Sequence, residues 1–270
     1  MRTRSTVLAV VVVALVAASM ASAWDTGLPT SRYLGLAGAG LALTRDASAV
    51  DMNPAALAVL EIGDKPAGAW EFQLAGTFEV AGDLDVWGAN FAGSPAGKNW
   101  GLGFSYYDAS PGSYDYSGWT VAYGRKVAEN TLLGASMTRF DEDSWDETIY
   151  NIGGLFLGNG IDWGFMLNDI TEETAPGMIV SAGAAANLAP GWTAVFDAFD
   201  ISDRIDQCFG LGVEFAPKDN LAFRAGMFEG GDWSAGVGFK ADRFSIDLAY
   251  VEMGDEDADD SIFVTASTNF

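Results

Sequence analysis

The sequence predicts an all-β protein, an antiparallel transmembrane β-barrel of about 14 strands. Three observations lead to this fold class. The chain starts with an export signal, apolar and polar residues then alternate along many short runs, and the chain ends on an aromatic residue, Phe270. Together they are typical of proteins that insert into the outer membrane of a diderm bacterium.

The export signal occupies the first residues of the chain. Arg2 and Arg4 form a basic start, residues 7–18 form an apolar run, and Ala21-Ser22-Ala23 gives the small residues that signal peptidase accepts. The apolar run is short for a membrane-spanning helix, so we expect a cleaved signal peptide over residues 1–23. A retained N-terminal helix is the alternative.

Composition excludes several classes of function. The formal net charge of −23 argues against nucleic acid as a partner, because binding to phosphates depends on Lys and Arg. The chain has no His, which removes Ser-His triads, His-ligated zinc and His general bases. Cys208 is the single cysteine, so no intramolecular disulfide forms. We therefore expect no enzyme activity, no catalytic residues, no cofactor and no metal site.

Alternation with period 2 predicts the strands. Along residues 70–80, every second residue is large and apolar, with a single glycine among them, and most of the residues between are polar. Similar runs recur, separated by turn signals rich in Gly, Pro, Asn and Asp. The 204 residues of 67–270 give about 15 per strand and turn if there are 14 strands, which suits strands of roughly 9–11 residues. Twelve strands is the nearest alternative.

The two faces of these runs distinguish a membrane barrel from a soluble sandwich. One face is large, apolar and almost free of charge, as a lipid-facing surface is, while the other carries Gly, Ala, Ser and Thr with scattered acids. We expect the acids Glu71, Glu79, Asp162 and Asp247 to face the lumen, where they favour cations if water fills it. A soluble barrel of the lipocalin type stays open, although such barrels have eight strands.

The two ends of the expected barrel region also carry signals. The last run, 261–270, alternates and closes on Phe270, which resembles the sorting signal of outer-membrane barrels. The region before the barrel, 24–66, lacks this alternation. It has a run of small apolar residues over 34–43, followed by a polar stretch. We expect a helical turn over 46–52, broken by Asn53-Pro54 because proline disfavours the α conformation in the residue before it.

This N-terminal region carries a family resemblance. The Gly-rich apolar run, followed by Arg45-Asp46-Ala47-Ser48-Ala49 and by Asn53-Pro54-Ala55, resembles the long-chain fatty-acid transporter (FadL-like) superfamily. It resembles the PorV/PorQ-type branch of small outer-membrane barrels still more. The resemblance implies that residues 24–66 fold inward as a hatch in the lumen of a barrel formed by 67–270.

The resemblance also implies roles for single residues. Asn53, Pro54 and Ala55 form the turn of the hatch, while Arg45 and Asp46 tie it to polar groups of the lumen. The alternative is that these residues only shape a plug and contact no ligand.

Three functions follow as hypotheses. The first is an outer-membrane, porin-like transport protein for hydrophobic or small solutes, which implies outer-membrane lipid and a hydrophobic small molecule as partners. The second is a non-catalytic binding or assembly protein, PorV-like, that serves secretion or surface anchoring and has a secreted protein as partner. The third is a structural or soluble secreted β-protein.

Overall fold

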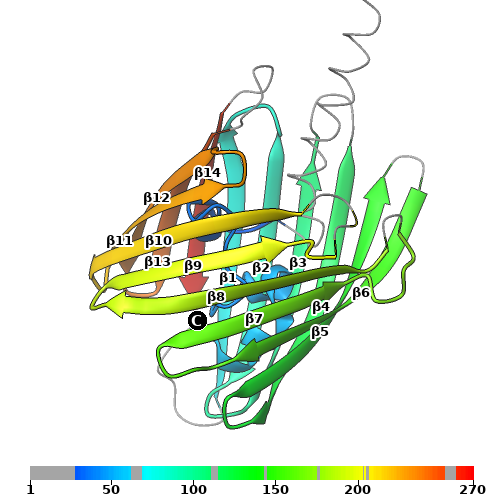
Figure 1. Ribbon diagram of the computed structural model, residues 1–270, viewed down its shortest axis with the longest axis horizontal. Helices are drawn as coiled ribbons and strands as arrows, with labels where there is room; N and C mark the ends of the chain where they lie inside the picture. The colour runs from blue at the N-terminus through cyan, green and yellow to red at the C-terminus, as the bar shows by residue number, and fades with distance from the viewer. Residues whose placement is uncertain are drawn as a thin grey trace, which may run out of the picture.

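The computed structural model describes residues 28–61, 69–110, 115–142, 145–174, 177–202, 204, 207–252 and 260–270. Within these residues, fourteen antiparallel strands form one closed ring, in which strands consecutive in the sequence are neighbours (Figure 1). The ring confirms the predicted barrel and its 14 strands. The expected signal peptide, residues 1–23, lies outside the described residues, as do both ends of the expected hatch region.

Three short helical elements precede the strands: α2 (Ser31–Leu34), α3 (Ala49–Met52) and the 3₁₀ helix η1 (Pro54–Val59). None of the helices in the described ranges is long and apolar enough to span a membrane. The strands are β1 (Trp70–Ala81), β2 (Val86–Pro95), β3 (Trp100–Ala109), β4 (Tyr116–Ala128), β5 (Thr131–Glu142), β6 (Trp145–Phe156), β7 (Ile161–Asn168), β8 (Ile179–Ala189), β9 (Trp192–Phe199), β10 (Cys208–Lys218), β11 (Leu221–Phe228), β12 (Trp233–Ala241), β13 (Phe244–Val251) and β14 (Ser261–Asn269).

The ring closes between its first and last strands. Residues of β1 and β14 pair from Gln73 with Asn269 to Ala81 with Ile262, across one irregularity near the end. Phe270 continues this ladder, because its backbone nitrogen and oxygen both bond to the backbone of Phe72 at 3.0 Å. Closure leaves no free sheet edge facing lipid, which is the condition for a β-structure in a bilayer.

The two rims of the barrel differ in the length of their connections. The rim where β1 starts and β14 ends carries connections of two to four residues and is called the turn rim. The opposite rim, the loop rim, carries connections of two to ten residues, including the two longest, 169–178 and 252–260. Short turns face the periplasm in outer-membrane barrels and long loops face outward, so we assign the turn rim to the periplasm.

The outward face of the wall is apolar, as the alternation predicts. In β1, Trp70, Leu74 and Phe78 are exposed, while Gln73 and Thr77 between them are buried. Outward aromatic residues gather near both rims, as girdles at the membrane interfaces do. Those near the turn rim include Trp70, Trp100, Trp163 and Trp192, and those near the loop rim include Trp87, Trp119, Trp233 and Tyr250.

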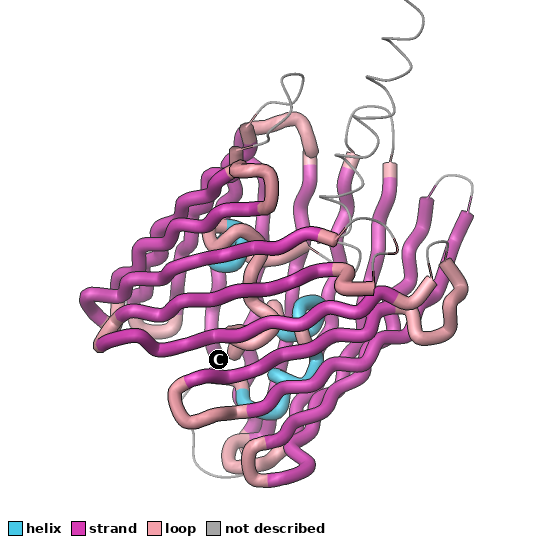
Figure 2. Tube along the Cα trace, in the orientation of Figure 1, coloured by secondary structure: helices cyan, strands magenta, loops and turns pink. Residues whose placement is uncertain are grey.

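Residues 28–61, called the inner segment here, lie within the ring of strands (Figures 1 and 2). Helix α2 contacts β12, β13 and β14, while η1 contacts β2 to β6, so the segment reaches different sides of the wall. The helical turn expected over 46–52 is shorter, α3, and ends at Asn53 in an extended conformation. A second turn, η1, follows at once because proline fits the first position of a helix.

Candidate functional site in the barrel lumen

A row of glycines on the wall holds η1. Gly101, Gly124, Gly134 and Gly153 are direct cross-strand neighbours on β3, β4, β5 and β6. A Cβ atom at any of the four would overlap the inner segment: the carbonyl oxygens of Leu57 and Pro54, the backbone nitrogen of Ala55 and the side chain of Asn53, respectively. The wall thus has no side chains where η1 lies, and the two backbones pack directly.

Asn53 joins the parts of the inner segment to the wall. Its side-chain amide donates to the carbonyl oxygens of Leu41 at 2.8 Å and of Gly154 at 3.0 Å. Its side-chain oxygen accepts from the backbone nitrogen of Ala55 at 3.2 Å and caps η1, while Pro54 begins that helix. Asn53, Pro54 and Ala55 are all buried against the wall.

Asp51 is a buried carboxylate between the inner segment and the wall. It accepts hydrogen bonds from Asn90 Nδ2 at 2.6 Å and from Ser105 Oγ at 2.5 Å, on β2 and β3. Burial raises the pKa of the Asp51 carboxyl to about 7, although its donors act in the opposite direction. We therefore expect the contact of α3 with the wall to depend on pH near neutrality.

Backbone groups of the inner segment also find partners on strands. Asp197 of β9 accepts from the backbone nitrogens of Gly40 at 2.6 Å and Leu41 at 2.9 Å through one oxygen. The other carboxylate oxygen of Asp197 is buried without a hydrogen-bond partner in the described structure. Further bonds of this kind join Ala47 to Gln73, Ala37 to Ser234 and Ser31 to Thr265.

A network of charges ties α2 to the far side of the wall. Arg32 donates to both carboxylate oxygens of Glu214, at 3.1 and 3.0 Å, in the paired geometry that arginine favours. Arg224 bonds to Glu214 at 2.7 Å and to Asp247 at 2.6 Å. Asp46 lies 3.6 Å from Arg32, so five charged groups form one connected network.

Tyr33 adds a donor to this network. Its hydroxyl donates to the Asp46 carboxylate at 2.9 Å. Burial and the nearby Asp46 raise the pKa of Tyr33 above its usual value, so the hydroxyl keeps its proton. Both members of the pair Arg45 and Asp46 therefore have polar contacts, Asp46 with α2 and Arg45 with strand β7.

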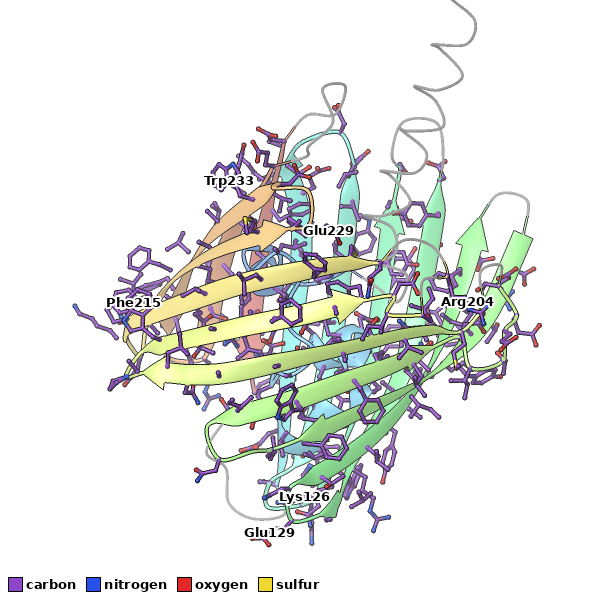
Figure 3. The ribbon with its side chains drawn as sticks, in the orientation of Figure 1. Lys126, Glu129, Arg204, Phe215, Glu229 and Trp233 are labelled. Carbon is purple, nitrogen blue, oxygen red and sulfur yellow. The ribbon has the colours of Figure 1, made fainter. Side chains whose placement is uncertain are left out.

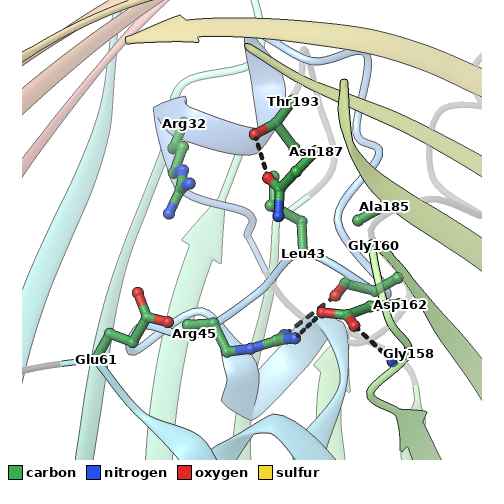
Figure 4. A pocket seen from close by; sticks show the side chains of 11 residues that line it. Arg32, Leu43, Arg45, Glu61, Gly158, Gly160, Asp162, Ala185, Asn187 and Thr193 are labelled. Carbon is green, nitrogen blue, oxygen red and sulfur yellow. Dashed lines mark hydrogen bonds and ion pairs between the residues drawn. The ribbon is translucent and has the colours of Figure 1, made fainter. Parts of the chain in front are cut away.

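Arg45 and Asp162 border a cavity at the turn rim (Figure 4). Arg45 donates to Asp162 at 2.8 Å, and Asp162 also accepts from the backbone nitrogen of Gly158. Beside this pair, Asn187 and Thr193 bond to each other at 3.1 Å. The cavity measures about 240 Å³ and its walls are mostly polar. It is large enough for a small solute or several waters.

The four acids expected in the lumen have partners in the structure. Asp162 and Asp247 pair with Arg45 and Arg224, and Glu79 accepts a hydrogen bond from the Ser261 hydroxyl at 2.5 Å. Glu71 is buried. The preference of these acids for cations in a water-filled lumen stays a prediction.

The lumen near the loop rim contains apolar and aromatic side chains beside buried polar ones such as Asp169 and Ser261. A buried cluster there joins the start of the inner segment to inward residues of several strands, with partly buried aromatic side chains packed around it. Its members include Leu28, Leu34, Val86, Tyr107, Val251 and Phe263, surrounded by Tyr116, Phe140 and Phe228. The core members of this cluster are buried against one another, whereas a water-filled porin has a polar interior.

Sequence reasoning missed several of these residues. It missed four charged residues whose partners lie far away in the chain: Arg32, Asp51, Asp197 and Glu214. For Asp197 and Glu214 there was one signal, since both occupy positions of their strands that alternate toward the lumen. The glycine row had a detectable signal, since alternating strands with glycine at inward positions indicate close backbone approach. Among the described residues, no group of His, Cys, Asp and Glu is arranged to hold a metal ion.

Comparisons with known proteins agree on the fold. No protein-family model matches the sequence, and no curated protein matches it in sequence. The toluene transporter TodX of Pseudomonas putida has a TM-score of 0.61 at 12% identity, over 89% of this chain and 97% of TodX. This chain has the fold of outer-membrane β-barrels. That fold and the exposed apolar band together place the protein in an outer membrane, as the sequence predicts.

Two further structures share the architecture. Omp33 of Acinetobacter baumannii has a TM-score of 0.54 at 12% identity, over 76% of this chain and 100% of Omp33. A bacterial polysaccharide outer membrane secretin has a TM-score of 0.50 at 13% identity, over 76% of this chain and 99% of the secretin. At these identities the likeness concerns the fold alone.

Proposed function

We propose that the protein is a passage for small hydrophobic solutes across the outer membrane, with the inner segment as its plug. The observation that carries this proposal is the buried apolar and aromatic cluster in the lumen at the loop rim, the end at which a solute would enter from outside. Apolar side chains favour apolar solutes over strongly hydrated ions and sugars. The fold shared with TodX, a toluene transporter, supports the same solute class.

In this proposal the inner segment must move aside before a solute can cross. Between the apolar cluster at the loop rim and the cavity at the turn rim, the inner segment fills the lumen and its core residues are buried. The segment is fixed by hydrogen bonds and ion pairs at separate points, of which Asn53, Arg45 and Arg32 are three. In this proposal Asn53-Pro54-Ala55 forms the seated turn of the plug, and Arg45 and Asp46 anchor it. The TodX likeness supports the resemblance to the fatty-acid transporter superfamily at the level of the fold, while the PorV/PorQ branch stays a hypothesis.

Uptake of labelled solutes tests the proposal. Toluene and hexadecanoate serve as probes in diderm cells that lack their own hydrophobic-solute transporter and express the full chain. Phe228 faces inward at the loop rim, and Phe223 on the same strand faces lipid. We expect F228S to lower uptake severalfold and the control F223L to leave it unchanged. Uptake no higher than in cells without the protein would overturn the proposal.

A second function is favoured by the filled lumen. A barrel whose interior is occupied also suits a platform that binds or assembles secreted or surface proteins without conducting anything. Recovery of a stable secreted partner with the detergent-solubilised barrel, together with no solute uptake, would support this function over transport.

A further inference from the structure

A pair of basic residues lies at the turn rim beside outward aromatic rings. Lys98 is in the β2–β3 turn, and Arg125 is near the end of β4; both are exposed. The β3–β4 ladder brings the two backbones close together. Arg125 lies opposite Trp100, two residues after Lys98, and the backbone nitrogen of Lys126 bonds to the oxygen of Asn99 at 2.7 Å. Figure 3 shows Lys126 at this rim.

The charges of this pair are not neutralised within the described part of the chain. No ion pair joins Lys98 or Arg125 to a carboxylate there, whereas Arg139 near the loop rim pairs with Asp141 and Asp146. The arginines Arg32, Arg45 and Arg224 of the lumen are also paired. The acid nearest in sequence, Glu129 in the β4–β5 turn, bonds to neither basic residue, and Lys126 adds a further positive charge.

The aromatic neighbours fix the depth of the pair in the membrane. Trp100 contacts Trp70 edge-on at 5.3 Å and Tyr123 at 6.3 Å, and these three rings belong to the outward girdle. A girdle marks the boundary of the hydrocarbon. Arg125 is two residues beyond Tyr123, about 7 Å at the rise of a strand, and therefore lies at the depth of lipid headgroups.

We propose that Lys98 and Arg125 bind the phosphate of an anionic phospholipid in the leaflet that faces the turn rim. The glycerol and upper acyl chains of that lipid pack on Trp70, Trp100 and Tyr123. Guanidinium and ammonium groups at this depth pair with phosphate oxygens, and adjacent indole rings favour the interfacial region. The site is on the outer surface of the barrel and is independent of any passage through the lumen.

Lipid selectivity measured on the full-length mature barrel tests this site. The protein is placed in bilayers of phosphatidylcholine with spin-labelled phosphatidylglycerol or spin-labelled phosphatidylcholine as probe. The readout is the relative association of the two probes. A control of equal charge exists at the same rim: Lys218 and Arg243 form no ion pair among the described residues either, but each is adjacent in sequence to an acid, Asp219 and Asp242, which reduces the local positive charge. The variants are K98Q/R125Q and the control K218Q/R243Q.

We expect the preference for phosphatidylglycerol to fall about tenfold in K98Q/R125Q and to change less than twofold in K218Q/R243Q. High salt should remove the wild-type preference as well, which tests the site even if a variant does not fold. An equal fall in both variants would show a diffuse charge effect and overturn the proposal. No preference in the wild type, or none lost in K98Q/R125Q, would overturn it too.

Discussion

The guanidinium of Arg45 donates a 2.8 Å hydrogen bond to the carboxylate of Asp162 and thereby joins the inner segment to strand β7. The two side chains are 13% and 30% exposed. A hydrogen bond to a charged group contributes about 1.5–3 kcal/mol. We expect R45A and D162A each to lower the urea midpoint of the folded barrel and to make the inner segment more accessible to protease.

The double variant R45A/D162A separates the pair from its surroundings. We expect it to be less destabilised than the sum of the single variants, because both remove the same bond. Arg139 and Asp146 near the loop rim provide the control, since they are 37% and 56% exposed and such pairs contribute about 0–1 kcal/mol. Strict additivity of R45A and D162A would contradict a coupled pair.

Gly134 tests the glycine row under η1. A Cβ atom there would overlap the backbone nitrogen of Ala55, which cannot move without the helix. We expect G134A to displace η1 at a cost of about 1–3 kcal/mol while the ladder stays intact. Ion conductance in planar bilayers measures this displacement, because we expect the lumen to open to ions when the inner segment leaves its position on the wall. The control is G76A, where a Cβ would meet only the side-chain ring of Phe78 and the more distant carbonyl oxygen of Gly88. Equal conductance of G134A and wild type would refute the conclusion that the glycine row holds η1 in place.

The raised pKa of Asp51 predicts that the packing of the inner segment against the wall depends on pH. Burial raises the pKa of its carboxyl to about 7, above the value in an unfolded chain. An acid with a raised pKa stabilises the folded state in its protonated form, so this contribution is lost as pH rises toward and through 7. We expect the urea midpoint of the wild type to fall between pH 5 and pH 8. In D51N that fall should be smaller, and an identical pH dependence in both proteins would exclude Asp51 as its source.

Asp197 anchors the inner segment through a single carboxylate oxygen. Removing the carboxylate in D197A leaves the nitrogens of Gly40 and Leu41 buried without an acceptor, each at a cost of about 1–3 kcal/mol. D197N keeps an acceptor oxygen at this point, and the other oxygen has no partner to lose. We therefore expect wild type and D197N to have similar midpoint temperatures of unfolding in detergent, and D197A to have a clearly lower one. A D197N variant as unstable as D197A would show that the charge, not the acceptor, holds the segment.

The architecture was accessible from sequence because it depends on local alternation. A strand such as β1 shows its two faces in consecutive residues, and its exposed Trp70, Leu74 and Phe78 follow from period 2 alone. The spacing of turn signals along the chain predicted about 14 strands and left 12 as the alternative, which the closed ring excludes. These features need no knowledge of which strands are neighbours across the barrel.

The contacts of the inner segment were not accessible in the same way. Arg32 and Glu214 are 182 residues apart, and their pairing depends on the register of the whole ring. The alternation along β10 places the side chain of Glu214 in the lumen, but it does not show which residue of the inner segment it contacts. The family resemblance singled out Asn53 and Arg45, and it gave no hint of Asp51 or Asp197.

The long separation between the inner segment and its partners sets an order of events in biogenesis. Ser31 bonds to Thr265, 234 residues later, and Asn53 bonds to Gly154, 101 residues later. Although it is translated early, the segment has no binding surface until the strands around it have assembled. We therefore expect docking to be a late step, after a stage at which the interior of the newly inserted barrel is open to water.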